Sequence, residues 1–163
     1  MDTIEAKARE RIQELLNSQK FVVLSTQRHG QPYSSLMAFA HTKDLSAILV
    51  ATGTATRKHG NISTEPRVSL LFDNRSNADS DFHAATALTA VGTIMQVVPQ
   101  ERENLQSLYL RRHPGLDAFL REPATAFLKI IIRHYLLVNQ FQQVMELHLT
   151  EQKDLFAPAS DYS

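Results

Sequence analysis

Residues 48–72 read ILVATGTATRKHGNISTEPRVSLLF, and the fold prediction begins from this stretch. An apolar run leads into a Thr/Gly turn, a short polar helix opens with Arg57 and Lys58, and a second strand follows Pro66. The first backbone N–H groups of a helix have no intrahelical partner, and the helix macrodipole adds partial positive charge beside them. Because two cations and several threonine hydroxyls accompany these groups, the helix start predicts an anion site that fits a phosphate.

An alternative interpretation of the same helix start is purely structural. Thr54 or Thr56 could be an N-cap, and Arg57 and Lys58 could form a solvated basic pair. Basic residues are not what the macrodipole favours in a first helical turn. Their placement therefore favours an anion that compensates them.

Strand-like patterns lie on both sides of this stretch. We expect strands at residues 21–26, 33–42, 45–51, 67–73, 86–98, 127–141 (which could be two strands) and 144–149. The strands at 33–42 and 67–73 carry small or apolar residues on both faces, which predicts that each is covered on both sides. Ser34 and Ser35 would then need backbone, water or a ligand as hydrogen-bond partners. Gly92 interrupts the strand at 86–98 and predicts a β-bulge or a bend at a barrel corner.

Three further segments have helical patterns: residues 3–18, residues 99–113 and a short piece at 116–121. Residues 73–81 predict a loop, with Asn74 and Arg75 at its near edge. These two side chains could meet a flavin or a sugar phosphate, or they could merely cap a strand. The sum of these elements predicts a mainly β fold, an antiparallel barrel of six or seven strands, closed or nearly closed, with an N-terminal helix and helices between the late strands.

Composition narrows the function classes. The 163 residues carry 17 basic and 17 acidic side chains, so the balance does not favour a nucleic-acid partner. No cysteine is present, which excludes disulfides, thiolate metal sites and cysteine nucleophiles. We expect one domain over residues 1–163, with a helix within 1–19, a frayed tail at 150–163 and no signal peptide or membrane span. A cytoplasmic protein is the default expectation.

Other catalytic patterns are weak. The seven histidines show no metal-ligand spacing, so we expect no metal site. The sequence also has no Gly-x-Ser-x-Gly elbow of a serine hydrolase.

Several motifs together resemble the pyridoxamine 5′-phosphate oxidase-like superfamily, the flavin-binding split β-barrels. They are the strand end Ala51-Thr52, the turn Thr56-Arg57-Lys58, Asn61, the strand Pro66-Arg67-Val68-Ser69-Leu70-Leu71-Phe72, and Ala90-Val91-Gly92 after a loop. The similarity is good over roughly residues 21–98 and looser elsewhere.

This resemblance implies a split barrel that binds FMN at a homodimer interface, with FAD, a deazaflavin or haem as alternatives. By position, Arg57 and Lys58 would hold the flavin phosphate, assisted by Thr56 and Thr52. The other implied cofactor-binding residues are Ser34, Ser35, Leu36, Ala51, Asn61, Asn74 and Arg75. The Asn74-Arg75 loop or the last strand would come from the other subunit. The implied partners are a second copy and a small molecule, with no nucleic acid and no membrane.

The end of the chain departs from the true pyridoxamine-phosphate oxidases. Those enzymes end in a tryptophan-containing segment with an Arg-Leu-His-x-Arg pattern that grips the substrate phosphate. This chain has no tryptophan, and its Arg133-His134 is followed by Tyr135-Leu136. Oxidation of vitamin B6 is therefore not expected, and the ending looks more like the haem-utilisation branch and related short flavoproteins.

Two functions remain open from the sequence. One is a flavin-dependent oxidoreductase acting on an unknown small molecule, with His134 and Tyr135 as the candidates for proton handling. His134 is more readily interpreted as an ordinary strand histidine. The other is a flavin- or haem-binding protein without turnover, for which His148, His83 or His113 would be the candidate haem ligands.

Overall fold

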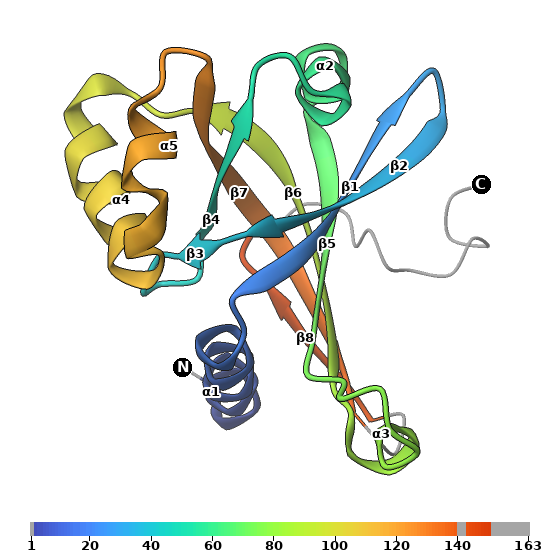
Figure 1. The fold of residues 1–163 in the computed structure, drawn as a ribbon. Coiled ribbons are helices and arrows are strands. Elements are labelled where there is room, and N and C mark those ends of the chain that lie inside the picture. The colour runs from blue at the N-terminus through green and yellow to red at the C-terminus, as the bar shows by residue number, and fades with distance from the viewer. Residues whose placement is uncertain (1, 140–142, 151–163) are drawn as a thin grey trace.

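The computed structural model describes residues 2–139 and 143–150, and in this part of the chain eight strands form one antiparallel sheet (Figure 1). The strands are β1 (Phe21–Arg28), β2 (Gln31–Ala38), β3 (Ala40–His41), β4 (Ala47–Gly53), β5 (Arg67–Asp73), β6 (Ala87–Gln96), β7 (Thr125–Val138) and β8 (Val144–His148). Their order is β2-β1-β5-β6-β7-β4-β3, with β8 paired to β7. The predicted mainly β fold is confirmed.

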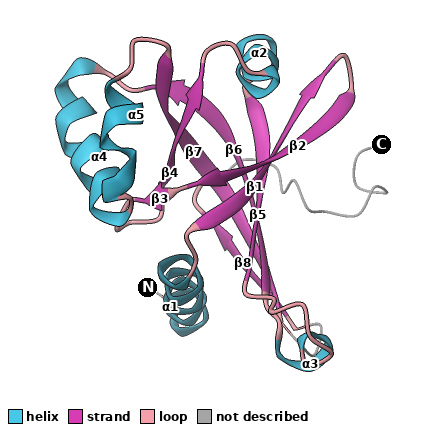
Figure 2. Cartoon of the chain, viewed as in Figure 1, coloured by secondary structure: helices cyan, strands magenta, loops and turns pink. Residues whose placement is uncertain are grey.

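Five α-helices decorate the described part of this sheet: α1 (Thr3–Ser18), α2 (Arg57–Thr64), α3 (Asp81–Ala84), α4 (Pro99–Arg112) and α5 (Asp117–Arg121). A short 3₁₀ turn, η1 (Pro114–Leu116), joins α4 to α5. Figure 2 shows α4 and α5 together beside β3 and β4, with α2 at one end of the sheet and α1 and α3 toward the other. The expected helices at 3–18, 99–113 and 116–121 are therefore confirmed to within a residue at each end. None of the described helices is long and apolar enough to cross a membrane.

Phe39 closes the barrel. It separates β2, which pairs with β1, from β3, which pairs with β4, so one bent stretch of chain connects the two edges of the sheet. The Phe39 N–H donates to the Lys20 carbonyl at 3.3 Å, and its fully buried ring meets Phe72 edge-on at 4.8 Å. The prediction of one continuous strand at 33–42 is therefore wrong, because the buried ring at Phe39 forces the break. This break supplies the eighth strand.

Two apolar clusters hold the fold together. The larger fills the barrel and includes Leu24, Leu70 and Ile130, with α1 covering one end through Ile12 and Leu16. The smaller lies between α4, α5 and the strands β4 and β7, and its members are Ala40, Leu49, Ala51, Val97, Tyr109, Leu120 and Phe127. Burial in this second cluster raises the pKa of Tyr109 to about 12.

The outer faces of β2 and β5 are exposed, which corrects the prediction that both strands are covered on both sides. Along β2, Met37 is buried whereas Leu36 is 68% exposed. On β5, Leu71 is 38% exposed between buried neighbours. The positions of the helices explain this exposure. Helix α1 packs against β5 and β8 from the core side, and α4 and α5 pack against β3, β4 and β7. In the described chain no helix covers this outer face.

The buried side chain of His41 makes the stability of the fold depend on pH. Its ring is buried on β3, with Nδ1 2.9 Å from the Thr42 carbonyl oxygen and Nε2 2.8 Å from Asn17 Oδ1. Desolvation lowers the pKa of His41 below 6.5, with a further lowering from the Arg112 charge, and these outweigh the raising effect of the Thr42 carbonyl. The unfolded chain therefore takes up the proton first as the pH falls.

We therefore expect the free energy of unfolding to be steady above about pH 6.5 and to decrease below it, levelling off once the pH passes the lowered folded-state pKa. Urea unfolding between about pH 7.5 and about pH 5 measures this dependence. A His41→Gln variant should lose the part of the slope that lies in this window. An identical slope in both proteins would assign the effect to other groups.

Candidate functional site

The start of α2 is the element that the sequence places at the site, and the structure builds it from threonines. Thr56 is the N-cap: its Oγ1 accepts from the His59 N–H at 3.2 Å and lies 2.9 Å from the Gly53 carbonyl. Thr52 Oγ1 lies 3.1 Å from Thr56 Oγ1. The N-cap interpretation of Thr56 is thus confirmed. The amide N–H groups of Arg57 and Lys58 have no hydrogen-bond partner in the described part of the chain, which leaves them for an anion.

A pocket of about 380 Å³ opens at this helix start. One wall is α2 and its turn, and the other is the tip of the β1–β2 hairpin; the lining residues are Arg28, Gln31, Pro32, Tyr33, Ala55, Thr56, Arg57, Gly60 and Asn61. Figure 1 shows the hairpin and β4 diverging at this end of the barrel, with α2 between them. Among the described residues, the lining of this pocket carries two arginines and no carboxylate. An anionic ligand would be attracted to it.

Arg28, Gln31 and Tyr33 belong to this pocket although sequence reasoning missed them. His29 and Gly30 form a two-residue hairpin turn, with φ of 51° and 79°. This turn pairs Arg28 with Gln31 and carries both side chains toward α2. The signal was present in the His29-Gly30 dipeptide between the two expected strands, because a two-residue turn fixes the register of the strands on either side.

Asn61 and Thr52 make side-chain hydrogen bonds to other residues of the chain. Asn61 is buried, lines the pocket and donates from Nδ2 to Thr26 Oγ1 at 3.0 Å, which ties α2 to β1. The Ala51 side chain packs in the smaller core cluster. Lys58 is half-buried on α2. Contact of Ala51, Thr52 and Lys58 with a cofactor remains a prediction.

Ser34, Ser35 and Leu36 face opposite sides of β2. Ser34 Oγ lies 3.5 Å from Ser25 Oγ on the outer face, where Leu36 also lies. Ser35 Oγ is buried and has no hydrogen-bond partner in the described part of the chain. A buried hydroxyl without a partner costs about 1–3 kcal/mol, so a polar ligand group at Ser35 would be favourable. Ser35 pairs with the buried Leu24 of β1, so its hydroxyl is on the barrel side of β2, and Ser35 is not among the residues that line the pocket at α2.

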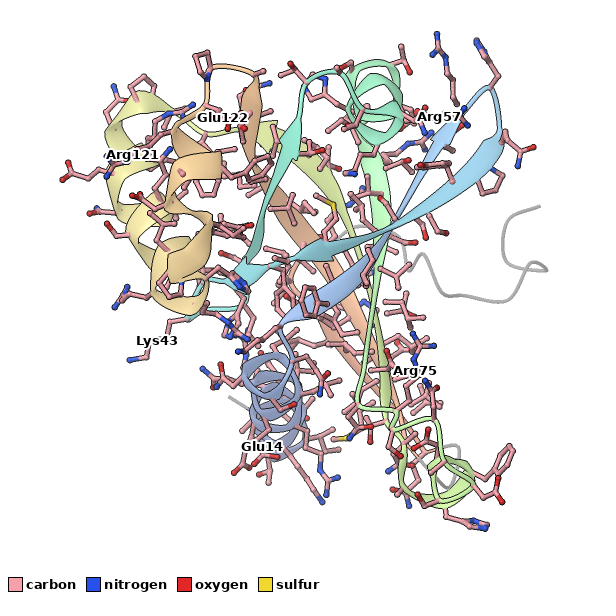
Figure 3. All side chains as sticks on the ribbon, viewed as in Figure 1. Glu14, Lys43, Arg57, Arg75, Arg121 and Glu122 are labelled. Carbon is pink, nitrogen blue, oxygen red and sulfur yellow. The ribbon has the colours of Figure 1, made fainter. Side chains whose placement is uncertain are left out.

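Asn74 and Arg75 lie far from this pocket within one chain. Figure 3 shows Arg57 and Arg75 at opposite ends of the barrel. Asn74 Oδ1 accepts from the Thr86 N–H at 2.7 Å, and Arg75 pairs with Asp73 at 3.0 Å. These contacts match the alternative in which the two residues stabilise a strand end. A cofactor role for them would require a second copy of the chain, and it remains a prediction.

Tyr135 cannot handle protons for a ligand in the pocket. It is fully buried, its hydroxyl donates to the Leu45 carbonyl at 2.8 Å, and burial strongly raises its pKa. The bond instead stabilises Leu45, whose φ of 67° is unusual for a leucine.

His134 is also fully buried, and its ring packs edge-on at 4.3 Å against His148. His148 Nε2 lies 2.8 Å from Glu146 Oε2. His113, one of the candidate haem ligands, is buried, with Nε2 2.7 Å from the Phe39 carbonyl oxygen. In the described residues no group of three or more His, Asp or Glu side chains is placed to hold a metal ion.

Comparison with known proteins agrees with this architecture. A family model described as pyridoxamine 5′-phosphate oxidase matches residues 8–139. A Schizosaccharomyces pombe protein named as a pyridoxamine 5′-phosphate oxidase homolog is 40% identical over 82 residues, which cover 43% of this chain and 43% of that protein. The alignment thus spans less than half of the relative.

Solved structures share the fold at low sequence identity. A heme binding protein from Mycobacterium smegmatis superposes with a TM-score of 0.76 at 15% identity, over 91% of this chain and 59% of that one. A FAD-binding protein from Mesorhizobium loti gives a TM-score of 0.61 at 15% identity, over 84% and 90% of the two chains. The family match extends over most of the chain and over every strand from β1 to β7. The chain therefore belongs to the pyridoxamine 5′-phosphate oxidase family.

Proposed function

We propose that this protein binds FMN as a homodimer and is an oxidoreductase that acts on a small molecule. The observation that carries the proposal is the pocket at the start of α2, where free helical N–H groups and Arg57 face Arg28 across the opening. This donor set matches the terminal phosphate of a flavin mononucleotide. The family match supports a flavin as the class of ligand.

The neighbouring strand fits the rest of such a cofactor. In the part of the chain that the structure describes, β2 has one hydrogen-bonded strand partner, β1, so backbone N–H and C=O groups on its other side are available to a ligand. The buried hydroxyl of Ser35 adds a polar group on that strand. A flavin, when bound, supplies the hydride or electron transfer. The protein then needs to bind its phosphate, orient its ring and exclude water, and it needs no nucleophilic side chain.

The exposed outer face supports the homodimer. Leu36, Val23 and Leu71 pair directly across β2, β1 and β5, and Phe21 lies on the same face two residues before Val23. We call these four residues the outer apolar patch. Phe21 is 59% exposed and Leu36 is 68% exposed, which is unfavourable for a monomer. A second copy on this patch would bury them and could bring its own Asn74 and Arg75 toward the cofactor.

The decisive experiment is a titration of the purified protein with FMN, followed by flavin fluorescence. We expect FMN to bind at micromolar concentration or below, and riboflavin, which lacks the phosphate, to bind at least about 100-fold more weakly. Addition of a nicotinamide donor should bleach the bound flavin, and sedimentation should give the mass of two chains. Colourless protein that refuses FMN as a dimer would refute the proposal.

Haem binding is the second candidate. It is supported by the fold shared with a heme binding protein from Mycobacterium smegmatis and by the partly exposed His148. A Soret band on addition of haem to the purified protein, abolished in a His148→Ala variant, would favour this function over the first.

A further inference from the structure

The chain bends at Phe39, and from this bend β2 and β4 move apart toward α2 (Figure 1). In the described part of the chain, β2 pairs with β1 alone, and β3 pairs with β4 at Ile48 and Leu49. One edge of β2 and the edge of β4 beyond Leu49 therefore have no strand partner there. The pocket at α2 lies at the wide end of this β2–β4 opening, because β2 and the turn after β4 both line it. The angle of the chain at Phe39 thus sets the width of the opening.

Phe39 is held by contacts with four distant parts of the chain. Its N–H donates to the Lys20 carbonyl at 3.3 Å, and its ring meets Phe72 at 4.8 Å. Its carbonyl oxygen lies 2.7 Å from His113 Nε2, which must be the donor because a carbonyl can only accept. The Arg112 guanidinium lies over its ring, 5.1 Å from the ring centroid. Two of these four contacts come from consecutive residues at the end of α4.

The Arg112 guanidinium also caps α1. Its Nη1 donates to the Leu16 carbonyl at 3.0 Å, and its Nη2 donates to the Gln19 carbonyl. The last turn of α1 has no basic residue of its own. The last carbonyls of a helix need donors and favour a positive charge beside them. Arg112 supplies both from another helix, so it fixes the end of α1 to the base of β2.

Helix α4 is itself fixed on the other side of the opening, because it packs against β3 and β4 (Figure 2). Tyr109 of this helix is buried in the smaller apolar cluster together with Leu49 and Ala51 of β4. Its ring centroid lies 5.2 Å from that of His113 and 5.7 Å from that of Phe127 on β7. The end of α4 thus connects β4 and β7 to the residue that follows β2.

We propose that Arg112 and His113 are positioning residues, which hold Phe39 and thereby set the width of the β2–β4 opening in which the flavin ring lies. Neither residue lines the pocket at α2, so both act through Phe39. Apolar packing alone would stabilise the same contact, whereas a satisfied set of directed hydrogen bonds also specifies one geometry. This inference rests on the proposed flavin function for its ligand, but the hold on Phe39 can be measured without flavin.

The test is a fluorescence titration of Arg112→Gln and His113→Leu with FMN. Both variants should bind FMN at least about 10-fold more weakly than the unsubstituted protein, because the strand beside the flavin ring is displaced. The visible absorption band of the bound flavin should shift as well. Inorganic phosphate, followed by the amide signals of Arg57 and Lys58, should bind all three proteins equally, because the α2 site is intact. His113→Gln keeps an N–H donor for the Phe39 carbonyl and should restore the FMN affinity to within about threefold.

Two controls separate positioning from a general loss of stability. Arg111→Gln makes the same change at the neighbouring arginine, which is exposed and forms no ion pair among the described residues. Leu147→Ala removes a buried side chain from β8, which pairs with β7 and packs against α1. Only Leu147→Ala should lower the midpoint of urea unfolding. Both controls should keep the FMN affinity within about twofold.

The proposal is overturned if Arg112→Gln and His113→Leu lose stability but bind FMN as before, or if Leu147→Ala loses as much FMN affinity as they do. Arg112→Lys covers the case in which the first two variants do not fold. Its ammonium keeps the charge at the end of α1, but it cannot donate to two carbonyls and also lie flat on the Phe39 ring. It should weaken FMN binding about threefold, and an unchanged affinity would overturn the proposal.

Amide hydrogen exchange of the flavin-free protein tests the hold on Phe39 by itself. The amides of β2 should exchange at least about 10-fold faster in Arg112→Lys or His113→Leu than in the unsubstituted protein, and Arg111→Gln should leave them unchanged. Unchanged exchange in β2 in the first two variants would overturn the proposal. If the unsubstituted protein does not bind FMN, the flavin function fails while this measurement still reports on Arg112 and His113. The two failures are therefore distinguishable.

Discussion

Replacing both Arg57 and Lys58 with Gln is expected to raise the dissociation constant for FMN at least about 100-fold. Each side chain would lose a charge-assisted hydrogen bond to the phosphate, and a hydrogen bond to a charged group contributes about 1.5–3 kcal/mol. The backbone N–H groups of the helix start remain, so some binding should survive. The measurement is quenching of flavin fluorescence, with riboflavin titrated alongside.

The control for this pair is Arg121→Gln, which removes a surface guanidinium on α5 without touching the pocket. The double variant and Arg121→Gln should unfold at the same urea concentration, because neither Arg57 nor Lys58 has an ion pair in the described chain. Riboflavin affinity should be equal in the double variant and the unsubstituted protein. If the double variant binds FMN as tightly as before, the phosphate is held elsewhere and the assignment of the α2 site is wrong.

The α2 wall of this pocket could be predicted from the local sequence. The Thr/Gly turn, the N-cap at Thr56 and the cations of the first turn are adjacent in sequence, so their meeting requires only that the helix forms. Arg28 and Tyr33 come from another part of the chain, and they reach the pocket because the β1–β2 hairpin lies beside α2. The sequence contains the hairpin turn, but it does not state which helix the turn will meet.

The fold shows the same division between local and tertiary signals. Helix bounds such as those of α1 followed from spacing and capping, and the bulge at Gly92 followed from a glycine within a strand. Periodicity could not reveal that Phe39 breaks its strand, because an apolar residue at that position also suits a continuous strand. Likewise, Leu36 and Leu71 look like core residues in the sequence. Which sheet face is covered depends on where helices dock, and that information is not in the strand itself.

Gly92→Ala is expected to decrease the free energy of unfolding by about 3 kcal/mol, as severe overpacking does. The new methyl group would lie 2.3 Å from the Ile131 carbonyl oxygen and 3.1 Å from Ile130 Cγ2. The first of these contacts is with backbone, which cannot turn aside as a flexible side chain could, so β6 and β7 must separate at the bulge. The measurement is the midpoint of urea unfolding, compared at equal slope.

The matched control is Gly115→Ala, at a glycine where an added Cβ would meet nothing within 4 Å. That change should alter the free energy of unfolding by less than about 1 kcal/mol. Equal stability of the two alanine variants would show that the β6–β7 contact at the bulge yields easily and that the position does not require a glycine.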